Sequence, residues 1–218
     1  MHQGVYWLTE QLRENESMAT SLDFLFQVQP PWIYVGTGEP ERRKWIPTHF
    51  YRRPNMNVCV RLLRGRKMRT LQGLMNEFGS AFQLLEGFAE TWNSLEECLA
   101  CLDEWLPAHA YVLVVENAEE VLADEARDQM AAFLTTLHSC GEWRSRPIED
   151  EGRFNRPPTP FHILMNMSRG VRIERERLVQ VAREIQIPVL VEIDERGSIP
   201  LAQGPDETLL QVLRVLPS

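Results

Sequence analysis

The sequence predicts an α/β protein in which helices cover a mainly parallel β-sheet, and two patterns support this prediction. Tyr111–Val115 is an unbroken apolar run rich in strand-forming residues, which is typical of a strand buried on both faces. From Val58 onward, strand and helix patterns alternate in the order βααβαβαβα, and strands separated by helices favour a parallel sheet. The 218 residues, 44% hydrophobic and 25% charged, are enough for one large domain with a sizeable core.

The first three elements of this series have clear signals. Val58–Leu63 is expected to form a strand, and Arg64–Lys67 the turn after it. Thr70 can cap a helix over Leu71–Phe82, where apolar residues recur at spacings of three and four.

A second helix is predicted to begin near Ser94, because Ser94–Glu97 has the form of a capping box, and to end before Pro107. One apolar stripe would then be formed by Leu95, Cys98, Leu99, Leu102 and Leu106. The later elements are expected as a helix over Glu119–His138, a surface loop over Gly141–Pro160, a strand over Phe161–Met165, a helix over Ile173–Gln186, a strand over Pro188–Ile193 and a final helix over Glu207–Leu216. The first 50 residues suggest a short helix over Tyr6–Glu14, strands over Leu22–Val28 and Trp32–Val35, a turn over Gly36–Pro40 and a basic linker over Arg42–Arg53.

Charge is strongly segregated along the chain, whose net charge is −8. Ten Lys and Arg but no Asp or Glu lie between Arg42 and Arg69, whereas Thr70–Ala126 holds twelve Asp and Glu and no Lys or Arg. Both signs are usually interspersed on a solvated surface. An acidic field of this kind attracts cationic partners and repels nucleic acid, so the sequence predicts a surface that meets a basic molecule.

The helix predicted within Glu90–Pro107 concentrates this acidity. Its outward residues are Glu96, Glu97, Ala100, Asp103 and Glu104. Carboxylates that stabilise a helix are usually interleaved with Lys or Arg four residues on, and here there are none. Their mutual repulsion costs stability, which indicates a role in binding a partner.

The run from Phe88 to Ala118, FAETWNSLEECLACLDEWLPAHAYVLVVENA, resembles the barstar family of ribonuclease inhibitors. The residues that carry the likeness are Trp92, Leu95, Cys98, Leu99 and Pro107. The resemblance covers roughly residues 57–167. It implies a barstar-like small parallel β-sheet covered by helices, with an N-terminal extension over residues 1–56 and a C-terminal αβα extension over residues 168–218.

The resemblance further implies an inhibitor or immunity protein, not an enzyme, which is monomeric when free, needs no cofactor and blocks a basic ribonuclease or other toxin. Glu97 matches the family's key inhibitory aspartate, and Asn93 matches a second aspartate without keeping its charge. Ala89 replaces a family glycine, and Glu96 stands where barstar itself has a tryptophan. The partner-binding residues expected on this basis are Phe88, Glu90, Trp92, Asn93, Glu96, Glu97, Ala100, Cys101 and Glu104.

Other chemistries have little support in the sequence. Cys98 and Cys101 form C-x-x-C, but inside an apolar helical stripe and without a second cysteine pair for zinc. The five histidines show no metal-ligand spacing, and there is no P-loop or G-x-S-x-G motif. The four cysteines form no disulfide framework, and neither a secretory signal nor a membrane-length apolar run is visible, so a cytoplasmic protein is expected.

The basic block Arg42–Arg69 leaves three interpretations open. It could fold back on the acidic stretch and neutralise it, bind an external acidic partner, or contact RNA through its interleaved aromatic residues. The alternative to an inhibitor is accordingly a non-inhibitory protein- or RNA-interaction module that retains the barstar-like fold.

Overall fold

The computed structural model describes residues 23–37, 57–84, 88–149, 155–168, 170–192 and 210–213. Within these residues six strands form one sheet in the order β2-β3-β4-β1-β5-β6, and every neighbouring pair is parallel. The strands are β1 (Ile33–Thr37), β2 (Val58–Arg64), β3 (Ala110–Glu116), β4 (Phe161–Met167), β5 (Val189–Glu192) and β6 (Leu210–Leu213). The predicted α/β class with a parallel sheet is therefore confirmed.

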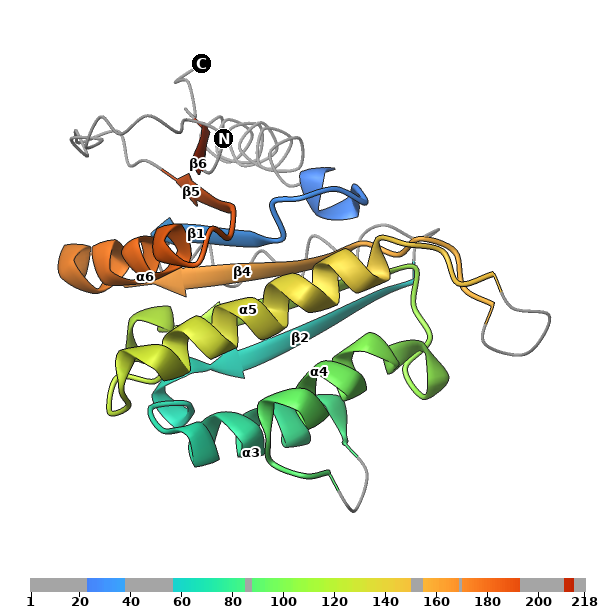
Figure 1. Cartoon of the computed structure of the whole chain (residues 1–218), viewed down its shortest axis with the longest axis horizontal. Coiled ribbons are helices and arrows are strands. Elements are labelled where there is room, and N and C mark those ends of the chain that lie inside the picture. The colour runs from blue at the N-terminus through green and yellow to red at the C-terminus, as the bar shows by residue number, and fades with distance from the viewer. Residues whose placement is uncertain are drawn as a thin grey trace, which may run out of the picture.

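The described residues form four α-helices on the same side of this sheet, with α5 crossing in front of the central strands (Figure 1). They are α3 (Leu71–Phe82), α4 (Trp92–Ala100), α5 (Arg127–Arg144) and α6 (Arg172–Glu184). The same residues also form short 3-10 helices: η1 (Asp23–Phe26), η2 (Gly65–Lys67), η3 (Leu102–Glu104) and η4 (Ala118–Glu120). None of the helices in the described ranges is both long and apolar enough to cross a bilayer.

The core follows the alternation of side chains along β3. Leu113 and Val115 point into the cluster beneath the helices, whereas Val112 and Val114 pack on the other face together with Leu25 from η1. All five residues are 0% exposed, which confirms that β3 is buried on both faces. Such burial of a continuous apolar run is the main stabilising term for this part of the chain.

Strand β1 occupies a central position although it lies far from its neighbours in sequence. Ile33 pairs with Ile163 of β4 on one side and with Val189 of β5 on the other. The predicted strand Trp32–Val35 is thus present, but it continues to Thr37, two residues into the predicted turn. The sheet therefore joins strands from before residue 57 and after residue 167 to the strands between them.

Helix α3 begins and ends as its sequence predicts. The Thr70 hydroxyl accepts a hydrogen bond of 3.1 Å from the backbone N–H of Gly73, which satisfies one of the free donors of the first turn. The chain leaves the helix through Gln83, which has a left-handed φ of 53°. The indole N–H of Trp105 donates to the Phe82 carbonyl at 3.0 Å and so ties the end of α3 to the segment after α4.

The helix predicted over Glu119–His138 is wrong at its start. A 3-10 turn occupies Ala118–Glu120, and Leu122 takes a left-handed φ of 52°, which a continuous helix cannot contain. The backbone N–H of Leu122 instead donates to the Met68 carbonyl at 2.8 Å. Helix α5 begins only at Arg127 and continues six residues past the predicted end, to Arg144.

Three further predictions are corrected. The loop expected over Gly141–Pro160 loses its first four residues to α5 and contains a short antiparallel bridge between Ile148 and Arg156. The strand expected over Leu22–Val28 is replaced by η1 within the described residues, and the last helix by strand β6 within Glu207–Leu216. Pairing with β5 favours the extended form of β6. The predictions for Tyr6–Glu14 and Arg42–Arg53 lie outside the described residues.

Candidate partner-binding site

Helix α4 both begins and ends earlier than the sequence indicates. The cap is Thr91, whose hydroxyl accepts a hydrogen bond of 3.3 Å from the Ser94 N–H, so the predicted capping box at Ser94 is wrong. The α-helix ends at Ala100, and a 3-10 turn over Leu102–Glu104 follows. The predicted continuous helix to the residue before Pro107 is therefore wrong as well.

Three side chains fix α4 on the core. Leu95 and Leu99 are 0% exposed and face α5 and the sheet. The ring of Trp92 lies with its centroid 6.2 Å from that of Phe133, and its N–H donates to Gln129 at 3.1 Å. Because these contacts fix both the buried stripe and the first turn, the opposite face of α4 is directed to solvent.

The nine predicted partner-binding residues lie on α4 or within four residues of its ends. The exposed members are Glu90, Asn93, Glu97, Cys101 and Glu104, and the partly buried members are Phe88, Trp92, Glu96 and Ala100. Phe88 packs against the main core, and Trp92 is held by α5, so both also support the local fold. The fold thus brings the nine residues together on one helix and its two flanks.

Part of the acidic stretch is neutralised by the chain itself, at the end of the sheet where β2 and β3 finish. Arg64 binds Glu77 at 2.7 Å, and Arg69 binds both Glu120 and Asp124 at 2.6 Å. Arg66 lies 3.6 Å from Glu120. For these three arginines the first interpretation of the basic block, folding back on the acidic stretch, is confirmed.

These pairs also lower the pKa values of two carboxyls. Burial on its own raises the pKa of Glu77, but hydrogen bonds from the guanidinium and backbone N–H of Arg64 outweigh it and bring the pKa below its usual value. Hydrogen bonds from Arg69 lower the pKa of Asp124. Both groups are therefore ionised partners of their arginines at neutral pH.

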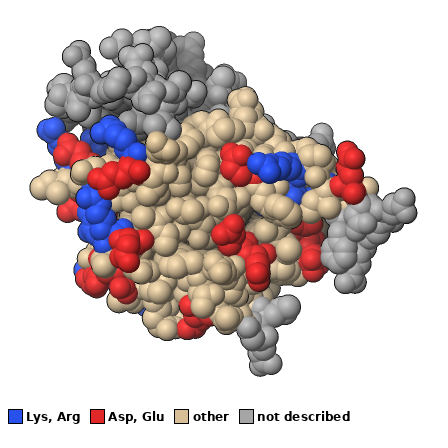
Figure 2. Space-filling model, viewed as in Figure 1, with Lys and Arg blue, Asp and Glu red and all other residues tan. Residues whose placement is uncertain are grey.

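The carboxylates around α4 are arranged differently. Within the described ranges, four of them take part in no ion pair: Glu90, Glu96, Glu97 and Glu104. We call these four the α4 carboxylates; Glu90 accepts one hydrogen bond, from the neutral amide of Gln72. Figure 2 shows acidic side chains over the α4 region without basic ones among them, whereas both signs are mixed over α6 at the left. The α4 carboxylates thus keep their charge available to a partner.

The cysteines near this surface are not activated. Burial is the main cause that raises the pKa of both Cys98 and Cys101. Charge interaction with Cys101 and then Glu97 raises the pKa of Cys98 further, and Glu104 and Asp103 do the same for Cys101. All four cysteines are free thiols. No group of three or more His, Cys, Asp or Glu that could hold a metal is present among the residues that the structure describes.

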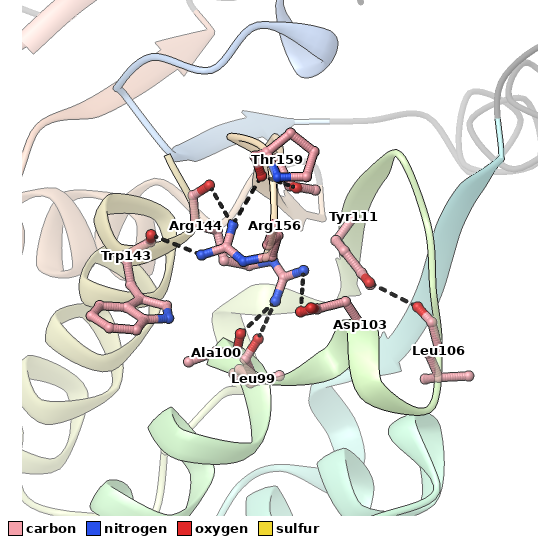
Figure 3. Close-up of polar contacts among 10 residues, drawn as sticks. Leu99, Ala100, Asp103, Leu106, Tyr111, Trp143, Arg144, Arg156 and Thr159 are labelled. Carbon is pink, nitrogen blue, oxygen red and sulfur yellow. Dashed lines mark hydrogen bonds and ion pairs between the residues drawn. The ribbon is translucent and has the colours of Figure 1, made fainter. Parts of the chain in front are cut away.

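Two residues that the sequence analysis did not single out lie directly behind α4. Arg144 and Arg156 are 0% and 4% exposed, and their guanidinium groups point toward the ends of α4 and α5 (Figure 3). Arg144 forms an ion pair of 3.1 Å with Asp103. Among the acidic residues of Glu90–Pro107, Asp103 is thus the one with a basic partner in the described part of the chain. Nothing in the local sequence distinguishes Arg144 from the exposed Arg146, so only the fold identifies it.

Comparison with known proteins bears on the same segment. No curated protein matches the chain. The family model described as Barstar (barnase inhibitor) matches residues 58–164, which run from the first residue of β2 into β4 and include all nine predicted residues. In this part, about half of its length, the chain belongs to the barstar family.

Proposed function

We propose that this protein is an inhibitor that binds a basic ribonuclease, or a toxin of similar charge, through α4 and the residues at its two ends. The observation that carries the proposal is the division of acidic residues within one stretch. Glu77, Glu120 and Asp124 are bound by arginines of the same chain, whereas the α4 carboxylates have no such partner among the described residues.

Energetic reasoning supports this assignment. Unpaired carboxylates near one another repel, so they are retained at a cost to folding unless a partner supplies positive charge. The active site of a ribonuclease is positively charged because it binds phosphate, and a row of carboxylates can occupy it in place of the RNA backbone. Glu97 is the central candidate, because it is exposed, lies mid-helix and matches the family's inhibitory aspartate.

The alternative RNA-binding module is less well supported. Arg64, Arg66 and Arg69 belong to the basic block that could contact RNA, but each is engaged by a carboxylate of the chain. An arginine that pairs with a carboxylate has less to gain from a phosphate.

Binding of a purified barnase-type ribonuclease, measured by calorimetry and by inhibition of RNA cleavage, tests the proposal. Glu97→Ala should weaken binding by at least about 1–2 kcal/mol, because an interfacial charge loses its partner. Asp124→Asn is the matched control: it removes a charge from the same acidic stretch, but one that Arg69 already neutralises, so affinity should not change. Equal affinity of wild type and Glu97→Ala would contradict the role of Glu97, and a ribonuclease left fully active would contradict inhibition itself.

A further inference from the structure

The carbonyl end of α4 is bound by a buried arginine from a different helix. Arg144, the last residue of α5, donates through Nη1 to the carbonyls of Leu99 and Ala100, at 3.2 and 2.6 Å. Its Nη2 donates to Asp103 Oδ1 at 3.1 Å. The last carbonyls of a helix lack partners inside it and carry partial negative charge, so a guanidinium satisfies both needs. Arg144 therefore fixes the last residues of α4 and the 3-10 turn after it as one unit.

The guanidinium of Arg144 is itself held in one orientation. Its Cζ lies 4.2 Å from the ring centroid of Tyr111, at the start of β3, in a cation–π contact. The Tyr111 hydroxyl donates to the Leu106 carbonyl at 2.7 Å, which attaches the chain beyond the 3-10 turn to the same strand (Figure 3). The end of α4 is thus attached to strand β3.

A second arginine repeats this arrangement one helix further on. Arg156 donates to the carbonyls of Arg144 at 2.9 Å and of Trp143 at 3.3 Å, the last two carbonyls of α5. The Thr159 N–H donates to the same Arg144 carbonyl at 2.8 Å. Arg156 therefore fixes the backbone from which Arg144 reaches α4.

Burying these two arginines costs folding free energy, which indicates a role beyond stability. Two guanidinium groups are removed from water, and only one carboxylate, Asp103, which is 36% exposed, is paired with them in the described residues. Apolar residues of similar volume often replace buried ion pairs without loss of stability. The contacts of Arg144 are specific in direction, because a planar fork must meet three oxygens at once.

We propose that Arg144 is a positioning residue for the partner-binding surface: it fixes the last turn of α4, so that Glu97, Cys101 and Glu104 meet the partner already arranged. Arg156 supports it by fixing the end of α5. The inference rests on the proposed function, because fixing the end of α4 affects binding only if α4 contacts the partner. Surfaces that are arranged before binding lose less conformational freedom on association and dissociate more slowly.

The test compares Arg144→Met and Arg144→Lys with Val181→Ala, a core substitution in α6 that leaves the contacts of Arg144 intact. Hydrogen exchange is measured over residues 98–106 and, as reference, over β3. Dissociation from a barnase-type ribonuclease is measured for the same proteins. Arg144→Met should speed exchange over residues 98–106 relative to β3, and should speed dissociation by about tenfold.

The variants separate positioning from general stability. Arg144→Lys keeps the charge but reaches fewer of the three oxygens, so its effects should fall between those of wild type and Arg144→Met. Val181→Ala should speed exchange in both segments equally and leave dissociation unchanged.

Two outcomes overturn the inference. If the wild-type protein binds the ribonuclease and both Arg144 variants dissociate at the wild-type rate, the positioning role is overturned and the proposed function stands. Wild-type protein that does not bind the ribonuclease would overturn the proposed function, and the inference with it.

Discussion

Gly141→Ala tests whether β1 and the residue before it dock on α5. A Cβ at Gly141 would lie 2.3 Å from Cγ of Trp32 and 2.6 Å from its Cδ2, whereas carbon atoms in contact are about 3.5–4.0 Å apart. The ring has little room to move, because Trp32 is 1% exposed and its N–H donates to Glu142 at 2.7 Å. The substitution must therefore displace the ring or the helix.

The expected change in the free energy of unfolding is the sum of three effects. Overpacking a core costs about 1–3 kcal/mol, and loss of the Trp32–Glu142 hydrogen bond about 1 kcal/mol more. Alanine is favoured over glycine inside a helix by about 1 kcal/mol, which offsets part of this cost. Gly141→Ala should thus lower the free energy of unfolding by about 1–3 kcal/mol.

Gly79→Ala, in α3, is the matched control. A Cβ at Gly79 would meet no atom within 4 Å, so only the preference of a helix for alanine over glycine remains. The free energy of unfolding of this variant should therefore rise by about 0.5–1 kcal/mol. Urea unfolding followed by circular dichroism should therefore place the two variants on opposite sides of wild type. If Gly141→Ala were as stable as Gly79→Ala, the packing of Trp32 on α5, and with it the docking of the β1 segment, would be refuted.

Three other outcomes are expected. Glu77→Gln should lower the free energy of unfolding by about 1–2 kcal/mol at neutral pH, because the charged hydrogen bond to Arg64 is weakened. Because folding lowers the pKa of Glu77, the stabilisation from its carboxylate is present above the ordinary pKa of 4.5 and is lost as pH falls. Urea unfolding should therefore show the stabilities of wild type and variant converging in acid. Thr91→Ala should cost about 1 kcal/mol in thermal or urea unfolding through loss of the α4 cap, whereas Ser94→Ala, at the wrongly predicted cap, should cost less. Cys101 is the exposed thiol, and its raised pKa makes labelling slow at neutral pH and faster as pH rises; a Cys101→Ser variant that labels at the wild-type rate would contradict this assignment.

Elements that depend on local signals are predictable from this sequence. Thr70 followed by a regular apolar spacing predicts α3 with its cap, and Tyr111–Val115 predicts a buried parallel strand. Glu97 is also predictable as an exposed residue of α4, because the apolar stripe of the helix fixes which side faces solvent.

Features decided by distant contacts are not predictable in this way. Ser94 has the better local capping pattern, but packing of Trp92 on Phe133 and Gln129 draws three more residues into α4, and Thr91 becomes the cap. Leu122 continues the apolar spacing of a helix, yet its backbone N–H binds the turn after β2. The burial of Arg144 depends on oxygens more than 40 residues away in the chain.

The central place of β1 limits how the protein can be shortened. A fragment cut to residues 58–164 would end inside β4 and expose the edge of the remaining strand that now lies against β1. Open edges of this kind recruit strands from other molecules, so such a fragment is expected to aggregate when expressed. Residues 23–37 should accompany the family segment in any transplant of its surface onto another scaffold, and strands β5 and β6 have no place to attach without them.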